Sequence, residues 1–324
     1  MKENEIRPQN IFNEYLKLAE QDVTTYFENA PRIHISCPAC GAKGVYAFNK
    51  KGFSYEECSE CLTLFVSPRP AKEAFDHYYT DSPSTRYWAT TFYKETESAR
   101  REKLWKPKAR LIKEKVERFS QAKTILDIGG GYGTFAEEIQ KIMDLDIVVI
   151  EPSVHLAKVC RDKGLSVMEQ FLEDISPDLI PKETKAFVSF ELFEHLHDPT
   201  DFLGTLNGLM QKNDLFIFTT LSGMGIDIQV LWENSKSISP PHHLNFFNPK
   251  SVQILLKRLD FKVIEITTPG KLDISIMENN SDLIHDRFWR NYLQIASEQD
   301  KENMQAFVAQ NLLSSHMMVV CSKK

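Results

Sequence analysis

The sequence has no long apolar run, no excess of basic residues and few cysteines, and each shortage excludes a class of protein. No stretch of the 324 residues approaches the roughly 20 apolar residues of a membrane-spanning helix, so no membrane insertion is expected. Lys and Arg number 39 against 45 Asp and Glu, so a nucleic-acid partner is not expected either. The start MKENEIRPQN is charged and lacks the apolar core of a signal peptide, which predicts a cytoplasmic protein.

Only six cysteines are present, and four of them form two Cys-x-x-Cys pairs separated by 17 residues. The four are Cys37, Cys40, Cys58 and Cys61. Disulfides are disfavoured without an export signal, and a redox pair is disfavoured because two pairs occur at ribbon spacing. Alternating residues at 44–48 and 53–57 predict two short strands between the pairs. We therefore expect a zinc ribbon whose Zn2+ is structural, because four thiolates leave no open coordination position.

Glycine is also scarce, yet four of the 13 glycines lie close together after an apolar run that starts at Thr124. The run and the turn read TILDIGGGYGTFA, and the turn residues are Asp127, Gly129, Gly130, Gly131 and Gly133. Glycine allows positive φ and a close approach of a ligand to the backbone. A dinucleotide fingerprint would require glycine at Thr134, so the pattern is D-x-G-x-G-x-G instead. An ordinary strand-to-helix turn is the alternative, but it rarely combines four glycines with a carboxylate at the strand end.

A second carboxylate follows the next expected strand, Asp146 to Ile150. Glu151 lies 20 residues after Gly131, where an acidic side chain in a doubly wound sheet accepts from both ribose hydroxyls. Its alternative role is that of a neighbour to the cap of the helix that starts at Pro152. Strands and helices alternate from Thr124 onward, which predicts a doubly wound α/β fold with a mainly parallel sheet.

The glycine pattern, Glu151 and the paired cysteines resemble class I S-adenosylmethionine (SAM) methyltransferases, in particular bacterial enzymes with a zinc ribbon, including sugar C-methyltransferases. The resemblance implies a Rossmann-like SAM domain with a late antiparallel strand, SAM as the cofactor and a small-molecule acceptor. It also implies four divisions: a helical segment at 1–35, the ribbon at 36–70, a helical and aromatic lid at 71–120, and the SAM domain at 121–324. A polar, mostly helical insertion is expected at about 279–313.

The resemblance further implies contacts to SAM and to the acceptor. In this family the adenine lies after the third strand, where this chain has Phe171 and Leu172. The stretch after the ribbon covers the active site, which makes Tyr79 and Trp88 candidate substrate-binding residues. Burial of these aromatic rings in a seam between domains is an equally good interpretation. Methylation of oxygen or of carbon stays open at this point.

Two more strand ends carry histidines. The run ELFEHLHDP resembles the fourth motif of these enzymes, which implies Glu191 at the methionine end of SAM and His195 facing the substrate. The run HHLNFF resembles a segment in which a Glu–His pair sits over the substrate, and His242 occupies the glutamate position beside His243. His195 and His243 are the candidate general bases, and an unperturbed histidine would make activity rise near pH 6.5. A helix-capping or core role is the alternative for His195.

Two expected helical stretches contain no candidate catalytic or binding residues. The basic stretch at 95–118, which Pro107 should kink or divide, is expected to be a helix with apolar anchors, Trp105 among them, and a solvated charged face rather than a nucleic-acid site. A helix at 11–27 should pack on the metal module or on a partner subunit, which leaves a homodimer open. A zinc-ribbon methyltransferase that acts on RNA or protein, and an inactive SAM-fold scaffold, are the alternative functions.

Overall fold

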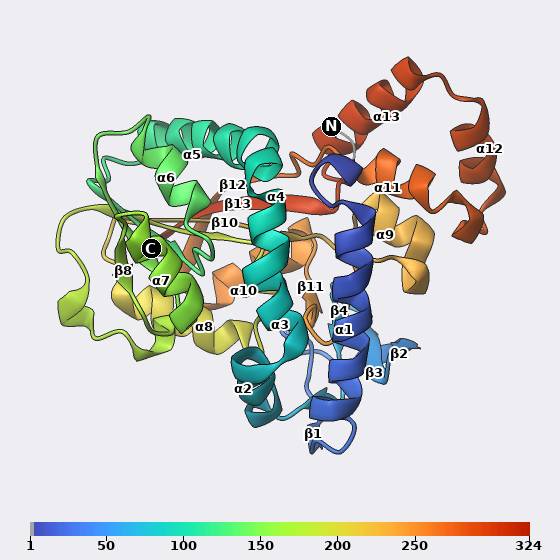
Figure 1. Ribbon diagram of the computed structural model, residues 1–324, viewed down its shortest axis with the longest axis horizontal. Helices are drawn as coiled ribbons and strands as arrows, with labels where there is room; N and C mark the ends of the chain where they lie inside the picture. The colour runs from blue at the N-terminus through green and yellow to red at the C-terminus, as the bar shows by residue number, and fades with distance from the viewer. Residues whose placement is uncertain (1–2) are drawn as a thin grey trace.

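A seven-stranded sheet forms the centre of the molecule in the computed structural model, which describes residues 3–324 (Figure 1). The strand order is β12-β13-β10-β9-β6-β7-β8. The strands are β6 (Thr124–Ile128), β7 (Asp146–Ile150), β8 (Ser166–Met168), β9 (Lys185–Phe190), β10 (Leu215–Leu221), β12 (Phe261–Thr267) and β13 (His316–Lys323). Only β13 runs antiparallel to its neighbours, β10 and β12. The predicted doubly wound, mainly parallel sheet with a late antiparallel strand is confirmed.

Helices cover both faces of this sheet and bury its central strands along their whole length. Every residue of β6 and β9 is buried. One face packs against α5 (Lys106–Phe119), α6 (Thr134–Gln140) and α7 (Val154–Asp162). The other face packs against α8 (Pro199–Leu209) and α10 (Pro249–Arg258). Asn248 caps the N-terminus of α10 and forms a capping box with Ser251.

The ribbon has its own four-stranded sheet with the order β11-β4-β3-β2. The strands are β2 (Gly44–Lys50), β3 (Phe53–Cys58), β4 (Leu64–Val66) and β11 (Asn245–Phe246), and β1 (Arg32–Ile33) pairs separately with β5 (Arg69–Pro70). The two expected ribbon strands are confirmed as β2 and β3. β11 belongs to the loop after β10, so the segment that carries the paired histidines is hydrogen-bonded to the ribbon.

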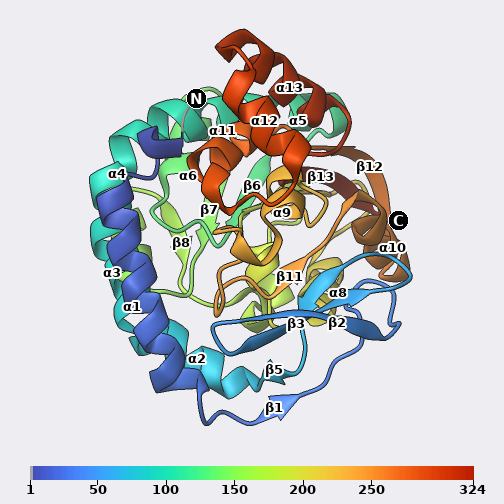
Figure 2. The same ribbon diagram turned by 90° about the vertical axis from the view of Figure 1, so that its right-hand side faces the viewer.

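A helical layer from the first third of the chain flanks the sheet (Figures 1 and 2). It contains α1 (Gln9–Phe27), α2 (Lys72–Asp81), α3 (Pro83–Tyr87) and α4 (Tyr93–Arg100), with π-helical turns at Trp88–Phe92 and Arg101–Trp105. The second π-helical turn ends where α5 begins, and Pro107 lies in the first turn of α5, where a missing N–H costs nothing. The chain thus divides near Pro107 as predicted. The expected solvated face holds for Arg110 and Glu114, which are exposed, but not for Lys115, which is buried and pairs with Glu265 at 2.7 Å.

The segment between β12 and β13 is mostly helical, as expected. It holds α11 (Asp273–Asn279), α12 (Arg287–Ile295) and α13 (Glu298–Gln310), and α11 packs on α9 (Ile226–Leu231). Figure 2 shows α12 and α13 at the opposite end of the molecule from the ribbon strands. Single 3-10 turns occupy Glu3–Glu5, Leu172–Asp174, Pro177–Leu179, Phe193–His195, Trp232–Asn234 and Ser281–Leu283. Across residues 3–324, no helix is long and apolar enough to cross a membrane.

Candidate active site

The glycine-rich turn joins β6 to α6 and requires glycine for steric reasons. Gly131 has a φ of +58°, and a Cβ built on it would lie 3.3 Å from the hydroxyl oxygen of Tyr93. A Cβ on Gly130 would lie 2.6 Å from Cγ1 of Val149, which is closer than real Cβ contacts allow. Without side chains on these residues, a ligand that binds between β6 and α4 can contact the backbone of the turn directly.

Glu151 holds this turn in place from the end of the neighbouring strand β7. Its Oε2 accepts the backbone N–H of Gly131 at 2.8 Å, and its Oε1 accepts the backbone N–H of Ser153 at 2.9 Å. Burial raises the pKa of Glu151, and the two N–H donors act in the opposite direction. Each carboxylate oxygen has a second lone pair, so Glu151 can still accept from the hydroxyls of a ligand.

Asp127, at the end of β6, is buried and has one oxygen without a partner. Its Oδ2 has no hydrogen bond among the described residues, although the side chain is only 1% exposed. Burial, and then the nearby Glu151, raises the pKa of Asp127 to about 7, while Lys108 acts in the opposite direction. An unsatisfied buried carboxylate is costly, so this oxygen suits a ligand that brings a cation or a hydrogen-bond donor.

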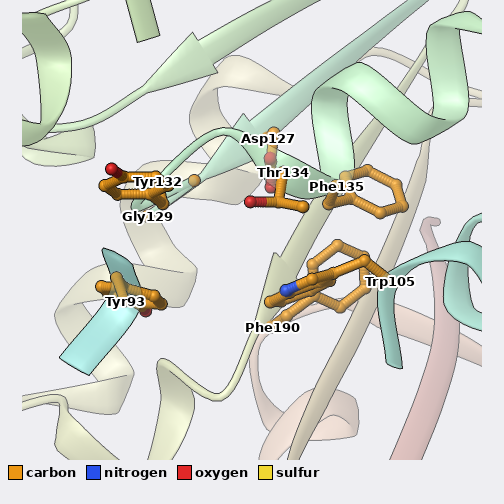
Figure 3. Close-up of a pocket in the computed structure, with 9 residues that line it drawn as sticks. Tyr93, Trp105, Asp127, Gly129, Tyr132, Thr134, Phe135 and Phe190 are labelled. Atoms are coloured by element: carbon orange, nitrogen blue, oxygen red, sulfur yellow. The ribbon is translucent and has the colours of Figure 1, made fainter. Parts of the chain in front are cut away.

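A small pocket of about 30 Å³ opens above the glycine turn (Figure 3). Its lining residues are Tyr93, Trp105, Asp127, Gly129, Gly130, Tyr132, Thr134, Phe135 and Phe190. The rings of Tyr93 and Tyr132 are stacked with their centroids 5.8 Å apart, and they face each other at one side of the pocket. Asp127 and the glycine turn thus share a pocket with aromatic rings from α4 and β9.

Sequence reasoning missed most of these aromatic residues. Tyr132 lies inside the glycine motif, and that position was the one available signal. Trp105 was expected only as an apolar anchor of a surface helix, and Tyr93 and Phe190 carry no local pattern that marks a site. They meet at the pocket because α4, α5 and the end of β9 converge there.

Glu191, expected at the methionine end of a bound cofactor, lies just beyond β9 with a φ of +52°. Its Oε1 accepts from Thr219 Oγ1 at 2.6 Å and lies 3.2 Å from Nδ1 of His316. Burial alone would raise the pKa of Glu191, but His316 and Lys108 hold it well below its ordinary value. The Nζ atom of Lys108 is 3.7 Å from this carboxylate. Lys108 was also missed by sequence reasoning, which expected the charged residues of its helix to form a solvated face.

His195 and His243 come together although they follow different strands. Their ring centroids are 4.8 Å apart, and one ligand atom each of His195, His243 and Glu194 lies within 4.8 Å of the others. Nδ1 of His243 is 2.6 Å from the carbonyl oxygen of Ser237. A carbonyl only accepts, so Nδ1 carries the hydrogen and Nε2 keeps a free lone pair.

Burial changes the titration of both histidines. It lowers the pKa of His243 to about 4, and it lowers the pKa of His195 well below the ordinary value, with His243 and His242 adding to that effect. The expectation of a protonation step near pH 6.5 is therefore wrong for this pair. Both rings are neutral at pH 7.

The expected substrate-binding residues Tyr79, Trp88 and His242 belong to one aromatic cluster. His242 is buried, and its Nε2 is 2.5 Å from the hydroxyl oxygen of Tyr78. Tyr15, which sequence reasoning missed, lies between them, with centroid distances of 4.6 Å to Trp88 and 5.6 Å to His242. The ring of Tyr79 is 6.1 Å from that of His242. Their contact with a substrate stays a prediction.

The two residues expected beside the adenine lie outside the pocket of Figure 3. Phe171 is 54% exposed, whereas Leu172 is buried in the hydrophobic core beneath β7 and α8. A flat ring in solvent at the end of β8 is available to a ligand that lies along the strand ends. The adenine contact stays a prediction.

The four paired cysteines lie together. The Sγ–Sγ distances are 3.5 Å for Cys37 and Cys61, 3.4 Å for Cys40 and Cys58, and 3.6 Å for Cys40 and Cys61. Zn–S bonds of about 2.3 Å in a tetrahedron place sulfur atoms about 3.8 Å apart, so the donor set fits Zn2+. None of the four forms a disulfide.

The ribbon also positions the segment that carries the histidines. The hydroxyl of Tyr55, on β3, donates to the carbonyl of His243 at 2.8 Å. Arg69 is fully buried and donates to Oδ1 of Asn245 at 2.8 Å. The side-chain amide of Asn248 donates to the carbonyl of Cys61 at 2.7 Å. A change in the metal module should therefore reach His243.

Comparison with known proteins gives a family and several similar folds. A family model described as a methyltransferase domain matches residues 99–266, whereas no curated relative matches the sequence. The plantazolicin methyltransferase BamL, solved with a triazolic desmethylPZN analog and SAH, is 13% identical, with a TM-score of 0.49 over 76% of this chain and 93% of that chain. A possible histamine N-methyltransferase from Thermotoga maritima is 15% identical, with a TM-score of 0.45 over 72% and 98% of the two chains. An O-methyltransferase of a Brevibacillus brevis trans-AT PKS multienzyme is 14% identical, with a TM-score of 0.46 over 71% and 76%.

Proposed function

Since residues 99–266 match its family model, this chain belongs to the methyltransferase domain family, and we propose that it transfers a methyl group from SAM to a small-molecule acceptor. One observation carries the assignment of the cofactor. Asp127, the glycine turn and Glu151 meet at the carboxyl ends of the adjacent strands β6 and β7, which is where ligands bind in open α/β sheets.

The residues of this edge fit the parts of SAM one by one. The second lone pairs of Glu151 would accept from the ribose hydroxyls, and the unpartnered Oδ2 of Asp127 would receive the ammonium group of the methionine part. Glu191 borders the same end, while Phe171 and Leu172 would lie by the adenine. The cofactor supplies an electrophilic methyl group on a sulfonium ion. The glycine turn contributes a backbone that a ligand can approach without meeting a Cβ.

His243 is the proposed general base on the acceptor side. Its Nδ1–H is held by Ser237, so Nε2 is the atom that takes a proton from the acceptor. A pKa of about 4 keeps Nε2 unprotonated at neutral pH but makes it a weak base. Most of the rate enhancement should then come from alignment of the acceptor atom with the methyl group. His195 would share this role, with Tyr79, Trp88 and His242 forming the wall above them.

We further propose that the ribbon holds one structural zinc ion. Cys37, Cys40, Cys58 and Cys61 would fill its coordination shell, which leaves it no catalytic position. The ion would stabilise the surface on which the His243 segment rests. We also propose that the chain has the four divisions named above and that it is related to sugar C-methyltransferases. A cytoplasmic location and a homodimer complete the proposal.

A small acceptor is favoured over RNA or protein by the aromatic cover. Tyr15 on α1 and Tyr78 on α2 pack against His242, next to the candidate base. A polymer would have to displace two helices to reach His243. Whether oxygen or carbon receives the methyl group depends on the acceptor.

Calorimetry and a transfer assay test the proposal. The protein should bind SAM and its demethylated product SAH, and it should transfer a labelled methyl group from SAM to a component of a metabolite extract. The variant His243→Ala is the matched control, because it should bind SAM but transfer slowly. Absence of SAM binding by the wild-type protein would overturn the proposal.

A further inference from the structure

Two arginines near the candidate active site have no anionic partner among the side chains that the structure describes. Arg7 precedes α1, and Arg100 is the last residue of α4. Their Nε atoms are buried and unpartnered. The guanidinium of Arg7 lies 5.4 Å from the ring of Phe12, and that of Arg100 lies 5.6 Å from the ring of Phe92.

Stacked rings connect the two guanidiniums to the histidine cluster, since Phe92 stacks on Trp88 with centroids 3.9 Å apart and Tyr15 lies between Trp88 and His242. The rings of Phe12 and Phe92 are 6.5 Å apart, so they form one aromatic shelf under both charges. Arg7 is close enough to lower the pKa of His243, and it also contributes to the lowered pKa of Arg100, after burial. The two positive charges repel each other, so a bound anion would relieve this repulsion.

The neighbouring Arg101 provides an internal contrast. It donates to Glu97 at 2.7 Å, to Glu137 at 2.7 Å and to Glu138 at 2.6 Å. This chain therefore surrounds an arginine with carboxylates where the role is structural. Glu191, which raises the pKa of Arg100, already binds Thr219 and His316 and lies beside Lys108.

We propose that Arg7 and Arg100 bind an oxyanion group, a phosphate or a carboxylate, that the methyl acceptor carries. Planar guanidiniums form paired hydrogen bonds with either group, and the partly buried setting strengthens them. The acceptor is then an anion whose charged group rests on the aromatic shelf while its reacting atom faces His243. This inference depends on the proposed methyl transfer, because it assigns the acceptor of that reaction.

The carboxylate of the cofactor is the competing occupant, so the experiment is made on protein saturated with SAH. Thermal unfolding is followed in sodium phosphate, sodium acetate and sodium chloride at equal ionic strength. A ligand that binds only the folded protein raises its Tm, and for a chain of 324 residues the rise is about 2 °C for each tenfold excess of the ligand over its Kd. Phosphate or acetate should raise the Tm above its value in chloride, and the stronger of the two identifies the anionic group.

The variants Arg7→Gln and Arg100→Gln should lose the anion effect. The matched control Arg110→Gln, at an exposed position of α5, should keep it. Each variant should also be at least as stable as the wild-type protein in chloride, because an unpaired charge has been removed. Phosphate also stabilises proteins that have no site for it, so the difference between the wild-type protein and a variant decides the question. If one variant fails to fold, the other still provides that difference.

Three results would overturn the inference: equal Tm values in the three salts, an anion effect that survives in both variants, or an anion effect that disappears when SAH is bound. The last would assign the arginines to the cofactor carboxylate. Failure of SAH to bind at all is a different result, since it refutes the proposed function itself.

Discussion

Replacement of Glu151 should weaken both the glycine turn and the binding of SAM. In the folded protein the two carboxylate oxygens accept the N–H groups of Gly131 and Ser153, and the side chain is 6% exposed. Alanine leaves both N–H groups without a partner. Glutamine has one acceptor oxygen, so it satisfies one N–H group and turns its own NH2 donors toward the other.

The hydrogen bonds set the expected magnitudes. Each unsatisfied buried donor costs about 1–3 kcal/mol, so Glu151→Ala should lower the free energy of unfolding by about 2–6 kcal/mol and Glu151→Gln by about half of that. The lost hydrogen bonds to the ribose are worth about 1.5–3 kcal/mol, which is a tenfold to hundredfold loss of SAM affinity. Both variants should show this loss of affinity, because neither presents a carboxylate.

Urea unfolding and calorimetric titration with SAM measure the two effects separately. Glu114→Ala is the control, since Glu114 is exposed on α5 and away from the turn. If Glu151→Ala binds SAM as tightly as the wild-type protein does, the assignment of the ribose to the end of β7 is wrong. If its stability is unchanged, the two backbone hydrogen bonds contribute nothing to the turn.

Three other predictions follow from the buried groups. The folded-state pKa of Asp127 is about 7, above the unfolded value of roughly 3.9, so ionisation of this group lowers the free energy of unfolding increasingly between about pH 4 and pH 7. In urea unfolding, Asp127→Asn should therefore be more stable than the wild-type protein at pH 8 but not at pH 4. The variant should also bind SAM more weakly. Cys58→Ser should lose zinc by metal analysis and also lower turnover, because the ribbon bears on His243; full occupancy of zinc in the variant would contradict the ribbon site. His243→Ala should lower turnover about a hundredfold at unchanged SAM affinity. Wild-type turnover should not depend on His243 protonation between pH 6 and pH 8, since the pKa of His243 is about 4. An ionisation near pH 6.5 that disappears in this variant would refute the lowered pKa of His243.

Local sequence patterns predicted the central part of the fold because the strands are mainly apolar and glycine has a unique conformational role. Asp127 and the glycines mark the end of β6, and Glu151 marks the end of β7, so their meeting follows from the pairing of adjacent parallel strands. The four cysteines predicted their own cluster because thiols at this spacing have few other uses. In each case the physical cause lies within a few residues of the pattern.

Tertiary structure decided the features whose cause lies far away in the chain. The two-residue strand β11 attaches the histidine segment to the ribbon, and no local pattern marks so short an edge. Tyr93 reaches the glycine turn only because α4 packs across it. The pKa of His243 depends on burial by segments distant in sequence, and the isolation of Arg7 and Arg100 depends on which carboxylates the fold brings near. Periodicity reports which side of an element is apolar, whereas the electrostatics of a site depend on every charge that packing places around it.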